Sequence, residues 1–190
     1  MNINHTHAIL EQLDRMKAGD HNILICPDLD TLREVCSHYC ETRLEKNEIV
    51  LLLVNHESIQ PIMNYLGENG VEIKKYRKDG SLIIVNSVER FFGSGADFLS
   101  FLDIVGKQIT KKGKKGISLI ADMGPFSHLG NIKHKIIDCE TFITKTSDIQ
   151  PASLLCGYHA RDLKTLTSDE MEILFEQHHK KIIIDDNNQY

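Results

Sequence analysis

Short β-branched runs alternate with longer helical patterns along the whole chain, and this alternation limits the fold more than any other feature. Several runs are continuously apolar, which is typical of parallel strands that helices cover on both faces. Strands separated by helices form βαβ units. The sequence therefore predicts a three-layer α/β domain with a mostly parallel sheet of about six strands. The predicted strands are Asn22 to Cys26, Ile49 to Val54, Leu82 to Val85, Ile117 to Asp122, Ser153 to Gly157 and Lys181 to Ile184.

Helical spacing of apolar residues predicts the connecting helices. Asp28 and Asp30 are alternative caps for the first of them. The others are Ser58 to Leu66, Ala96 to Lys111, a helix within Leu129 to Thr144, and a last helix that begins at Ser168. A short amphipathic helix precedes the first strand. We therefore expect residues 1–18 to form an N-terminal helical extension and residues 19–190 to form a single domain.

Composition bounds the environment of the protein. A chain of 190 residues with 41% apolar and 26% charged residues can bury one good core. Its longest apolar runs are far shorter than the roughly 18 residues of a membrane span, and its first 20 residues do not read as a signal peptide. Five cysteines, an odd number, fit reduced thiols. A net charge of -5 disfavours nucleic acid as a direct partner. We expect a cytoplasmic protein with no membrane contact.

The end of the first predicted strand lacks a phosphate-binding loop. Pro27-Asp28-Leu29-Asp30 stands where a nucleotide-binding protein of this class carries G-x-x-x-x-G-K-[ST]. Asp122 ends a strand as a Walker B acid does, but no lysine and hydroxyl are present to hold phosphates. The sequence also lacks a G-x-S-x-G elbow and an H-E-x-x-H motif. We therefore expect no ATP binding and no catalytic residues.

The order of several motifs resembles the MEDS family, named for methanogens, methylotrophs and the DcmR sensory protein. The motifs are His21-Asn-Ile-Leu-Ile-Cys, Glu48-Ile-Val-Leu-Leu-Leu-Val, Gly80-Ser-Leu-Ile-Ile-Val, Ile120-Ala-Asp-Met-Gly, Leu154-Leu-Cys-Gly-Tyr and Thr165-Leu-Thr-Ser-Asp-Glu. The resemblance covers about residues 19–185. It implies a RecA-like or KaiC-like fold without a Walker A loop, used as a ligand sensor in signalling and transcription.

The resemblance also implies a site and a partner. A histidine and a cysteine of the family, proposed to bind a metal, a cofactor or a hydrocarbon-derived ligand, correspond to His21 and Cys156. Members are often fused to a histidine kinase or to a DNA-binding module, and no such module is found in this sequence. A signalling partner such as a histidine kinase or a transcription regulator is therefore expected to be a separate protein.

A second set of candidate ligand-binding residues lies at the carboxyl ends of the predicted parallel strands, because ligands of open α/β sheets bind at that edge. If the first strand lies between the fourth and the fifth, Cys26, Asp122, Cys156 and His159 converge there. Cys156, His159 and Cys26 have the donor types of a thiophilic metal site. The predicted ligand-binding residues are His21, Cys26, Asn55, Asp122, Met123, Cys156 and His159.

Two geometric arguments separate these candidates. His21 begins its strand, about 16 Å from Cys26 at ~3.3 Å per residue, so we expect that it cannot share a compact metal site with Cys156. His178 and His179 have no partner at a suitable spacing and are expected to be a surface pair. Core packing remains the alternative account of Cys26 and Cys156, since free cysteine often behaves as a small buried hydrophobe.

The sequence favours a small-molecule sensory domain that binds an organic ligand or a metal ion and regulates a partner. Two alternatives from other classes remain open. The first is an enzyme, either a degenerate nucleotide-binding ATPase or a thiol-dependent catalyst with Cys156 as nucleophile and His159 as base. The second is a structural adaptor that acts as a homodimer. Bound nucleotide would favour the former, and a pocket filled by bulky side chains the latter.

Overall fold

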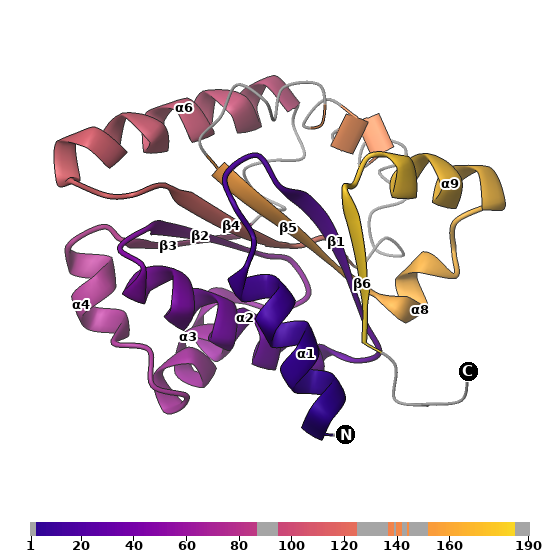
Figure 1. Ribbon diagram of the computed structural model, residues 1–190, viewed down its shortest axis with the longest axis horizontal. Helices are drawn as coiled ribbons and strands as arrows, with labels where there is room; N and C mark the ends of the chain where they lie inside the picture. Colours follow the sequence, from indigo (N-terminus) through magenta and orange to yellow (C-terminus); the bar gives the residue numbers. More distant parts are fainter. Residues whose placement is uncertain are drawn as a thin grey trace.

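The computed structural model describes residues 3–86, 95–124, 137, 138, 140, 141, 144 and 152–184. Within them a six-stranded sheet lies between two layers of helices (Figure 1). The elements are α1 (Ile3–Asp14), β1 (His21–Cys26), α2 (Leu29–Glu45), β2 (Ile49–Val54), α3 (Ile59–Glu68), α4 (Ile73–Lys78), β3 (Leu82–Asn86), α6 (Gly95–Lys112), β4 (Ile117–Asp122), β5 (Ala152–His159), α8 (Ala160–Leu163), α9 (Ser168–Glu176) and β6 (Lys180–Ile183).

The sheet confirms the predicted α/β class. All of its strand pairs are parallel, and the strand order is β3-β2-β4-β5-β1-β6. The expected place of the first strand is wrong, because β1 lies between β5 and β6 and not between the fourth and fifth strands. Strand β5 therefore separates β1 from β4. Cys26 and Asp122, which were expected on adjacent strands, end strands that are not neighbours.

Strand β5 is longer than its apolar pattern suggested. It runs from Ala152 to His159 and is buried throughout, whereas the sequence predicted an end at Gly157. Cys156 therefore lies inside the strand and not at its carboxyl end. The short helices α4 and α8, of six and four residues, were not predicted, since neither is long enough to show a helical stripe. The helix predicted within Leu129 to Thr144 falls mostly outside the described residues, of which 137, 138, 140, 141 and 144 are helical.

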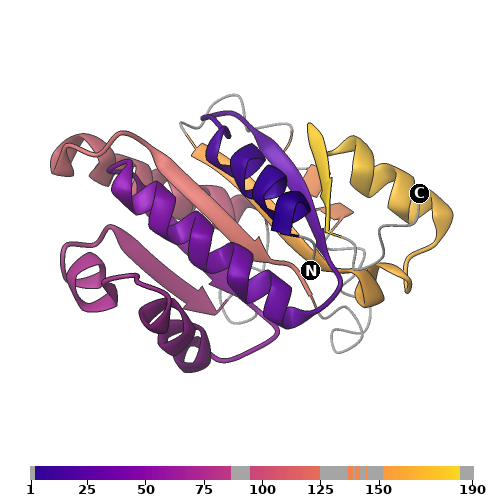
Figure 2. The ribbon, with the colours of Figure 1, turned by 60° about the horizontal axis from the view of Figure 1, so that its bottom comes forward.

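Each face of the sheet has its own apolar core. Alternate side chains of β1 point to opposite faces, so Ile23 and Ile25 belong to one core while Leu24 and Cys26 belong to the other. Helices α1, α2 and α3 cover the face of Leu24 and Cys26, and α6, α8 and α9 pack on the face of Ile23. Figures 1 and 2 show the two helical layers on either side of the sheet.

Helix α1 packs on the core through α2. Ile9 and Leu13 are buried in the same apolar cluster as Val35 of α2. The buried Arg43 side chain donates a hydrogen bond of 2.9 Å to the carbonyl oxygen of Met16, which fixes the chain between α1 and β1. None of the helices in the described parts of the chain combines the length and the apolarity that crossing a bilayer requires.

The N-terminus of α2 carries its own anion. The Asp28 carboxylate accepts a hydrogen bond of 2.7 Å from the Thr31 backbone N–H and caps the helix. This bond is the main reason why the pKa of Asp28 is lowered. Helix N-termini after a first strand bind phosphate in nucleotide-binding folds. Here a side-chain carboxylate occupies the donor that a phosphate would use.

Replacing Asp28 with alanine is expected to lower the free energy of unfolding by about 1 kcal/mol, the usual effect of losing an N-cap. Because the pKa of Asp28 is lowered in the folded state, its contribution is present above pH ~3.8 and is lost as the pH falls below that value. Urea denaturation at neutral and acidic pH measures both effects. Asp30→Ala, a change in the exposed first turn of the same helix, is the control and should have a much smaller effect.

Candidate functional site

Four buried side chains of metal-binding types meet on the face of the sheet that α6 and α9 cover. They are His21, Glu140, Cys156 and His178, and one ligand atom from each lies within 4.8 Å of all the others. His21 Nε2 is 3.3 Å from Cys156 Sγ and 3.1 Å from Glu140 Oε2. His178 Nε2 is 3.7 Å from the same Glu140 oxygen. We call these four residues the buried quartet.

The strand register explains how two of the four residues meet. His21 is the first residue of β1 and pairs with Leu154, while Cys156 pairs with Ile23. His21 and Cys156 are therefore diagonal neighbours two positions apart on adjacent parallel strands, and their side chains point to the same face. Glu140 reaches them from the helical residues before β5. His178 follows Gln177, the C-cap of α9, so three other parts of the chain converge on β1.

Hydrogen bonds outside the quartet fix both imidazole rings. His178 Nδ1 is 2.8 Å from the carbonyl oxygen of Leu174, which only accepts, so Nδ1 carries the proton. Thr144 Oγ1 donates to the carbonyl of Glu140 or Gln177, and it is therefore an acceptor for His21 Nδ1 at 3.2 Å. If both rings are neutral, both Nε2 atoms present lone pairs to the centre of the quartet. Such outer contacts are the usual way in which proteins orient histidine ligands of metals.

The Glu140 carboxylate also suits a cation, because it is a buried anion. Burial alone would raise the pKa of Glu140, but His178, His21 and the Tyr158 hydroxyl lower it to about 2. Tyr158 donates a hydrogen bond of 2.6 Å to Glu140 Oε1, which leaves Oε2 facing the histidines. Burial lowers the pKa of His178 and favours the neutral ring. Within the described residues, His178 Nε2 has no hydrogen-bond partner.

The donor set of the quartet fits zinc. Zinc in proteins is bound by cysteine sulfur, histidine nitrogen and carboxylate oxygen, mostly with four ligands in a tetrahedron. Two imidazole nitrogens, one carboxylate oxygen and one thiol supply four ligands of these types. The Cys156 S–H can donate to only one neighbour at a time, His21 Nε2 or Glu140 Oε2, so the remaining lone pairs and the carboxylate would repel one another if nothing positive lay between them. A divalent cation, or a proton on one imidazole, would relieve that repulsion.

A second polar cluster lies at the carboxyl edge of the sheet, where β2 and β4 end. His56 Nδ1 contacts Asp122 Oδ1, and His56 Nε2 lies 2.9 Å from Asp162 Oδ2. The Asp122 carboxylate also accepts hydrogen bonds from the backbone N–H groups of Asn55 and His56, at 2.9 and 2.6 Å. Burial lowers the pKa of His56, but its two aspartate partners outweigh that effect and raise it. His56 thereby links the ends of β2 and β4 to α8.

Little space remains beside this second cluster. The cavity next to His56, Asp122 and Cys36 has a volume of about 20 Å³, which is room for about one water molecule. A β-carbon added at Gly124 would lie 2.3 Å from the His56 ring and 2.6 Å from Asp162 Oδ2. Glycine is therefore needed where the chain passes the ion pair. As lined by the described residues, the cavity beside Asp122 has no room for an organic ligand.

Residues 20–178 match the family model described as MEDS, the MEthanogen/methylotroph, DcmR Sensory domain. The chain belongs to the MEDS family. All four residues of the buried quartet lie inside the matched region, which ends at His178.

The MEDS fold of this chain is shared with proteins of very different sequence. A KaiC-like protein of the hyperthermophilic archaeon Pyrococcus horikoshii OT3 superimposes with a TM-score of 0.63 at 13% identity, over 91% of this chain and 75% of that one. The flagellar accessory protein FlaH of Methanocaldococcus jannaschii superimposes with a TM-score of 0.60 at 12% identity, over 95% of this chain and 79% of that one. These likenesses confirm the RecA-like and KaiC-like fold. No curated protein matches the sequence.

The MEDS domain brings together one pair of predicted residues that sequence geometry had separated. The expectation that His21 cannot share a compact site with Cys156 is wrong, because their side chains are 3.3 Å apart. The error came from placing Cys156 at the carboxyl end of its strand. Strand β5 continues beyond Cys156 as far as His159. The diagonal neighbour of Cys156 in β1 is therefore the first residue, His21, and not the last, Cys26.

The predicted trio of Cys26, Cys156 and His159 does not assemble. Cys26 pairs with His159 across β1 and β5, but Cys156 points to the opposite face of the sheet. Burial, with help from Asp28 and Asp122, raises the pKa of the Cys26 thiol to about 12, which disfavours the thiolate that binds metals. His159 accepts a hydrogen bond from the Arg161 backbone N–H and caps α8. Its role as a ligand remains a prediction.

The remaining predicted residues separate in the same way. Asn55 and Asp122 lie in the cluster around His56, where the side-chain amide of Asn55 has no hydrogen-bond partner among the described residues. Met123 donates its backbone N–H to the Gly157 carbonyl oxygen at 2.9 Å, and its side chain packs in the core on the side of α6. The carboxyl edge thus holds Cys26, Asn55, Asp122 and His159 near one another, without Cys156.

Sequence reasoning missed Glu140 and His178. His178 was assigned to a surface pair, but it is buried, and only His179 is exposed. The capping box of α9 at Thr167 and the helix length could have indicated that His178 falls in the turn that leads into β6. Glu140 lies between two apolar pairs, Ile136-Ile137 and Phe142-Ile143, but Asp138 lies two residues before it, so nothing in the sequence distinguishes the two acids. Cys139, which stands between them, lies outside the described residues.

Proposed function

We propose that this MEDS chain is a sensory domain that binds a zinc ion at His21, Glu140, Cys156 and His178 and signals its occupancy to a separate partner. The observation that carries the proposal is the convergence of four different donor side chains, all buried, within 4.8 Å. A buried carboxylate and two inward imidazole nitrogens cost free energy unless a cation or a proton balances them. Zinc would supply that balance and would polarise the Cys156 thiol towards the thiolate.

Zinc binding can change the arrangement of the domain, and so be detected by a partner, because the four ligands come from separate parts of the chain. Two come from strands in the middle of the sheet, one from the helical residues before β5 and one from the end of α9. A metal that binds only when these parts are assembled stabilises that arrangement, and the effect grows with metal concentration. Helix α9 and the described helical residues at 137, 138, 140, 141 and 144 are the parts whose position would depend on the metal. A histidine kinase or a transcription regulator that contacts them would receive the signal.

Zinc titration of the metal-free protein tests the proposal. We expect one zinc ion per chain, with tight binding lost in Cys156→Ala. Competition with a chromophoric chelator measures affinity, and elemental analysis after gel filtration measures stoichiometry. Cys36→Ala is the matched control, since Cys36 is also a buried free thiol but packs on the opposite face of the sheet. Thermal unfolding of each variant without metal confirms that it is folded.

Two results would contradict the proposal. The first is a folded wild-type protein that binds no zinc at micromolar concentrations. The second is a Cys156→Ala variant that binds zinc as tightly as Cys36→Ala does. The first result would leave the quartet as a hydrogen-bonded core network, and the second would show that any zinc site does not depend on Cys156.

A further inference from the structure

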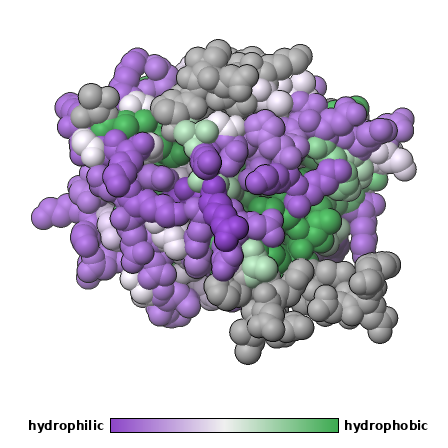
Figure 3. All heavy atoms as spheres, in the orientation of Figure 1, coloured by the Kyte–Doolittle hydropathy of each residue, from purple (hydrophilic) through white to green (hydrophobic). Residues whose placement is uncertain are grey.

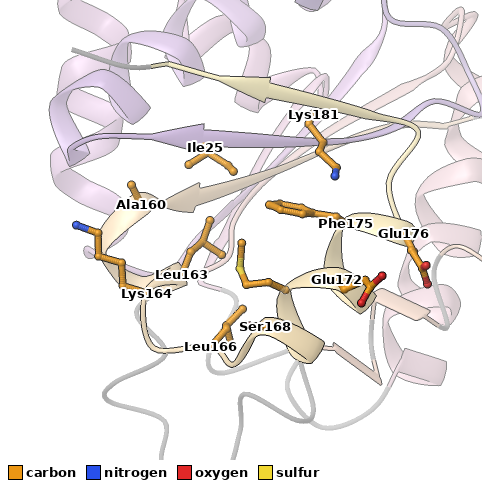
Figure 4. Close-up of a pocket in the computed structure, with 11 residues that line it drawn as sticks. Ile25, Ala160, Leu163, Lys164, Leu166, Ser168, Glu172, Phe175, Glu176 and Lys181 are labelled. Carbon is orange, nitrogen blue, oxygen red and sulfur yellow. The ribbon is translucent and has the colours of Figure 1, made fainter. Parts of the chain in front are cut away.

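An open groove lies where α8 and α9 approach the edge of the sheet at β1 and β6. Its volume is about 820 Å³. The space-filling view shows apolar side chains exposed together in this region (Figure 3), and the close-up shows them from the side of the groove (Figure 4). Its lining includes Leu163, Lys164, Leu166, Met171, Phe175 and Lys181.

The walls of this groove are mainly apolar. Ile25 and Leu163 are buried residues of the core, while Leu166, Met171 and Phe175 pack against that core and remain partly accessible. The volume is in the range of roughly 300–1,000 Å³ that is typical of small-molecule sites. An apolar surface of this extent favours a ligand with a hydrocarbon part.

The ammonium group of Lys181 lies beside the apolar walls of the groove. The Lys181 ammonium nitrogen lies 4.0 Å from the centre of the Phe175 ring, a cation–π contact that holds it on the groove side of β6. Among the described residues, no carboxylate lies within ion-pair distance of Lys181. Glu172 and Glu176 of α9 also line the groove, and neither forms an ion pair with Lys181 (Figure 4). Lys181 therefore offers, beside apolar side chains, an ammonium group that has no ion-pair partner among the described residues.

We propose that this groove binds an amphipathic carboxylate, a fatty-acid-like anion whose hydrocarbon tail lies against Leu163, Leu166 and Met171 and whose carboxylate pairs with Lys181. An ammonium group close to an aromatic ring and an apolar wall is complementary to a ligand with one anionic end. The proposal is independent of the zinc site. Helix α9 borders both, however, since its C-terminal end leads into His178.

Decanoate is the probe for the experiment, and decanol is the uncharged comparison. Methyl resonances of the full chain are followed by NMR while either compound is added below its solubility or micelle limit. We expect saturable binding of decanoate, with shifts at Leu163, Leu166 and Met171. Lys181→Gln should weaken decanoate binding about fivefold, the effect of a partly exposed ion pair, and should leave decanol binding unchanged. Lys164→Gln is the matched control, because its ammonium group points away from the groove in Figure 4.

Each other outcome would overturn the proposal. Absence of saturable binding, or shifts that avoid these methyl groups, would show that the groove is not a site for such anions. Equal effects of Lys181→Gln and Lys164→Gln would remove the assigned carboxylate contact. Protection of the same methyl groups that depends on protein concentration without decanoate would assign the groove to a second copy of the chain. Lys181 is exposed, so its replacement should not impair folding.

Discussion

Glu140→Ala is expected to lower the free energy of unfolding by about 3 kcal/mol in metal-free protein, because loss of one member of a buried ionic network leaves the others without compensation. The change removes the acceptor for the Tyr158 hydroxyl and the carboxylate that faces His21 and His178. Urea denaturation in the presence of a chelator measures this effect separately from any contribution of zinc. Glu34→Ala, on the exposed face of α2, is the control and should change stability by less than about 0.5 kcal/mol.

The same carboxylate predicts how stability depends on pH. The pKa of Glu140 is about 2 in the folded state, against 4.5 ordinarily, so its contribution is present above pH 4.5 and is lost as the pH falls towards 2. The pKa of His178 is also lowered, so its contribution is present above pH 6.5 and declines as the pH falls below that value. Both changes destabilise the folded state in acid. Glu140→Gln should lose the part of this dependence that lies below pH 4.5.

A stability loss in Glu140→Ala no greater than that in Glu34→Ala would contradict this interpretation. The contacts of the Glu140 carboxylate with His21, His178 and Tyr158 would then not stabilise the folded state. An unchanged acid dependence in Glu140→Gln would show that other carboxyl groups cause the acid unfolding.

His56→Ala is the second change for which we expect a large effect, again about 3 kcal/mol. His56 lies between Asp122 and Asp162, and all three side chains are buried. Alanine would leave two carboxylates next to each other without a cation. Because the pKa of His56 is raised, the stabilising contribution of the protonated ring is complete below pH 6.5 and is lost as the pH rises through its folded value.

Denaturation at pH values from about 6 to 9 measures this difference between wild type and His56→Ala. His38→Ala is the matched control, since His38 also faces a carboxylate, Asp14 at 3.1 Å, but in a more exposed position. Its loss should cost less than about 1 kcal/mol. Equal effects of the two substitutions would show that burial adds nothing to the pair at His56. A wild-type advantage over His56→Ala that does not shrink with rising pH would show that His56 is neutral when folded.

The fold could be predicted from the sequence because its signals are local. A continuously apolar run such as Ile49 to Val54 identifies a buried strand without knowledge of its neighbours, and the structure has β2 over the same residues. Helix α6 (Gly95–Lys112) differs by one residue at each end from the predicted Ala96 to Lys111. The expected family also proved correct.

The site could not be predicted in the same way because it depends on strand order and register. The placement of β5 beside β1 brings Cys156 next to His21, and no local pattern reveals which strands are neighbours. A difference of two residues in the end of β5 moved Cys156 from the edge of the sheet to its interior. His178 was missed because its partners Glu140, Cys156 and His21 lie in other elements, and no local pattern shows that these elements meet. Glu140 has no regular pattern around it that marks an inward-facing acid.

The pairing of the first and last strands of the sheet has a consequence for the synthesis of the protein. Cys156 lies 135 positions after its partner His21, and His179, which bonds to the His21 backbone, lies 158 positions after it. At the usual rate of ~5–20 residues per second, a ribosome needs about 8–30 s to make the segment between His21 and His178. During that time a nascent chain exposes His21 without its partners. Zinc captured by the quartet would therefore mark a chain that has completed its folding, so that occupancy reports the integrity of the domain together with the supply of metal.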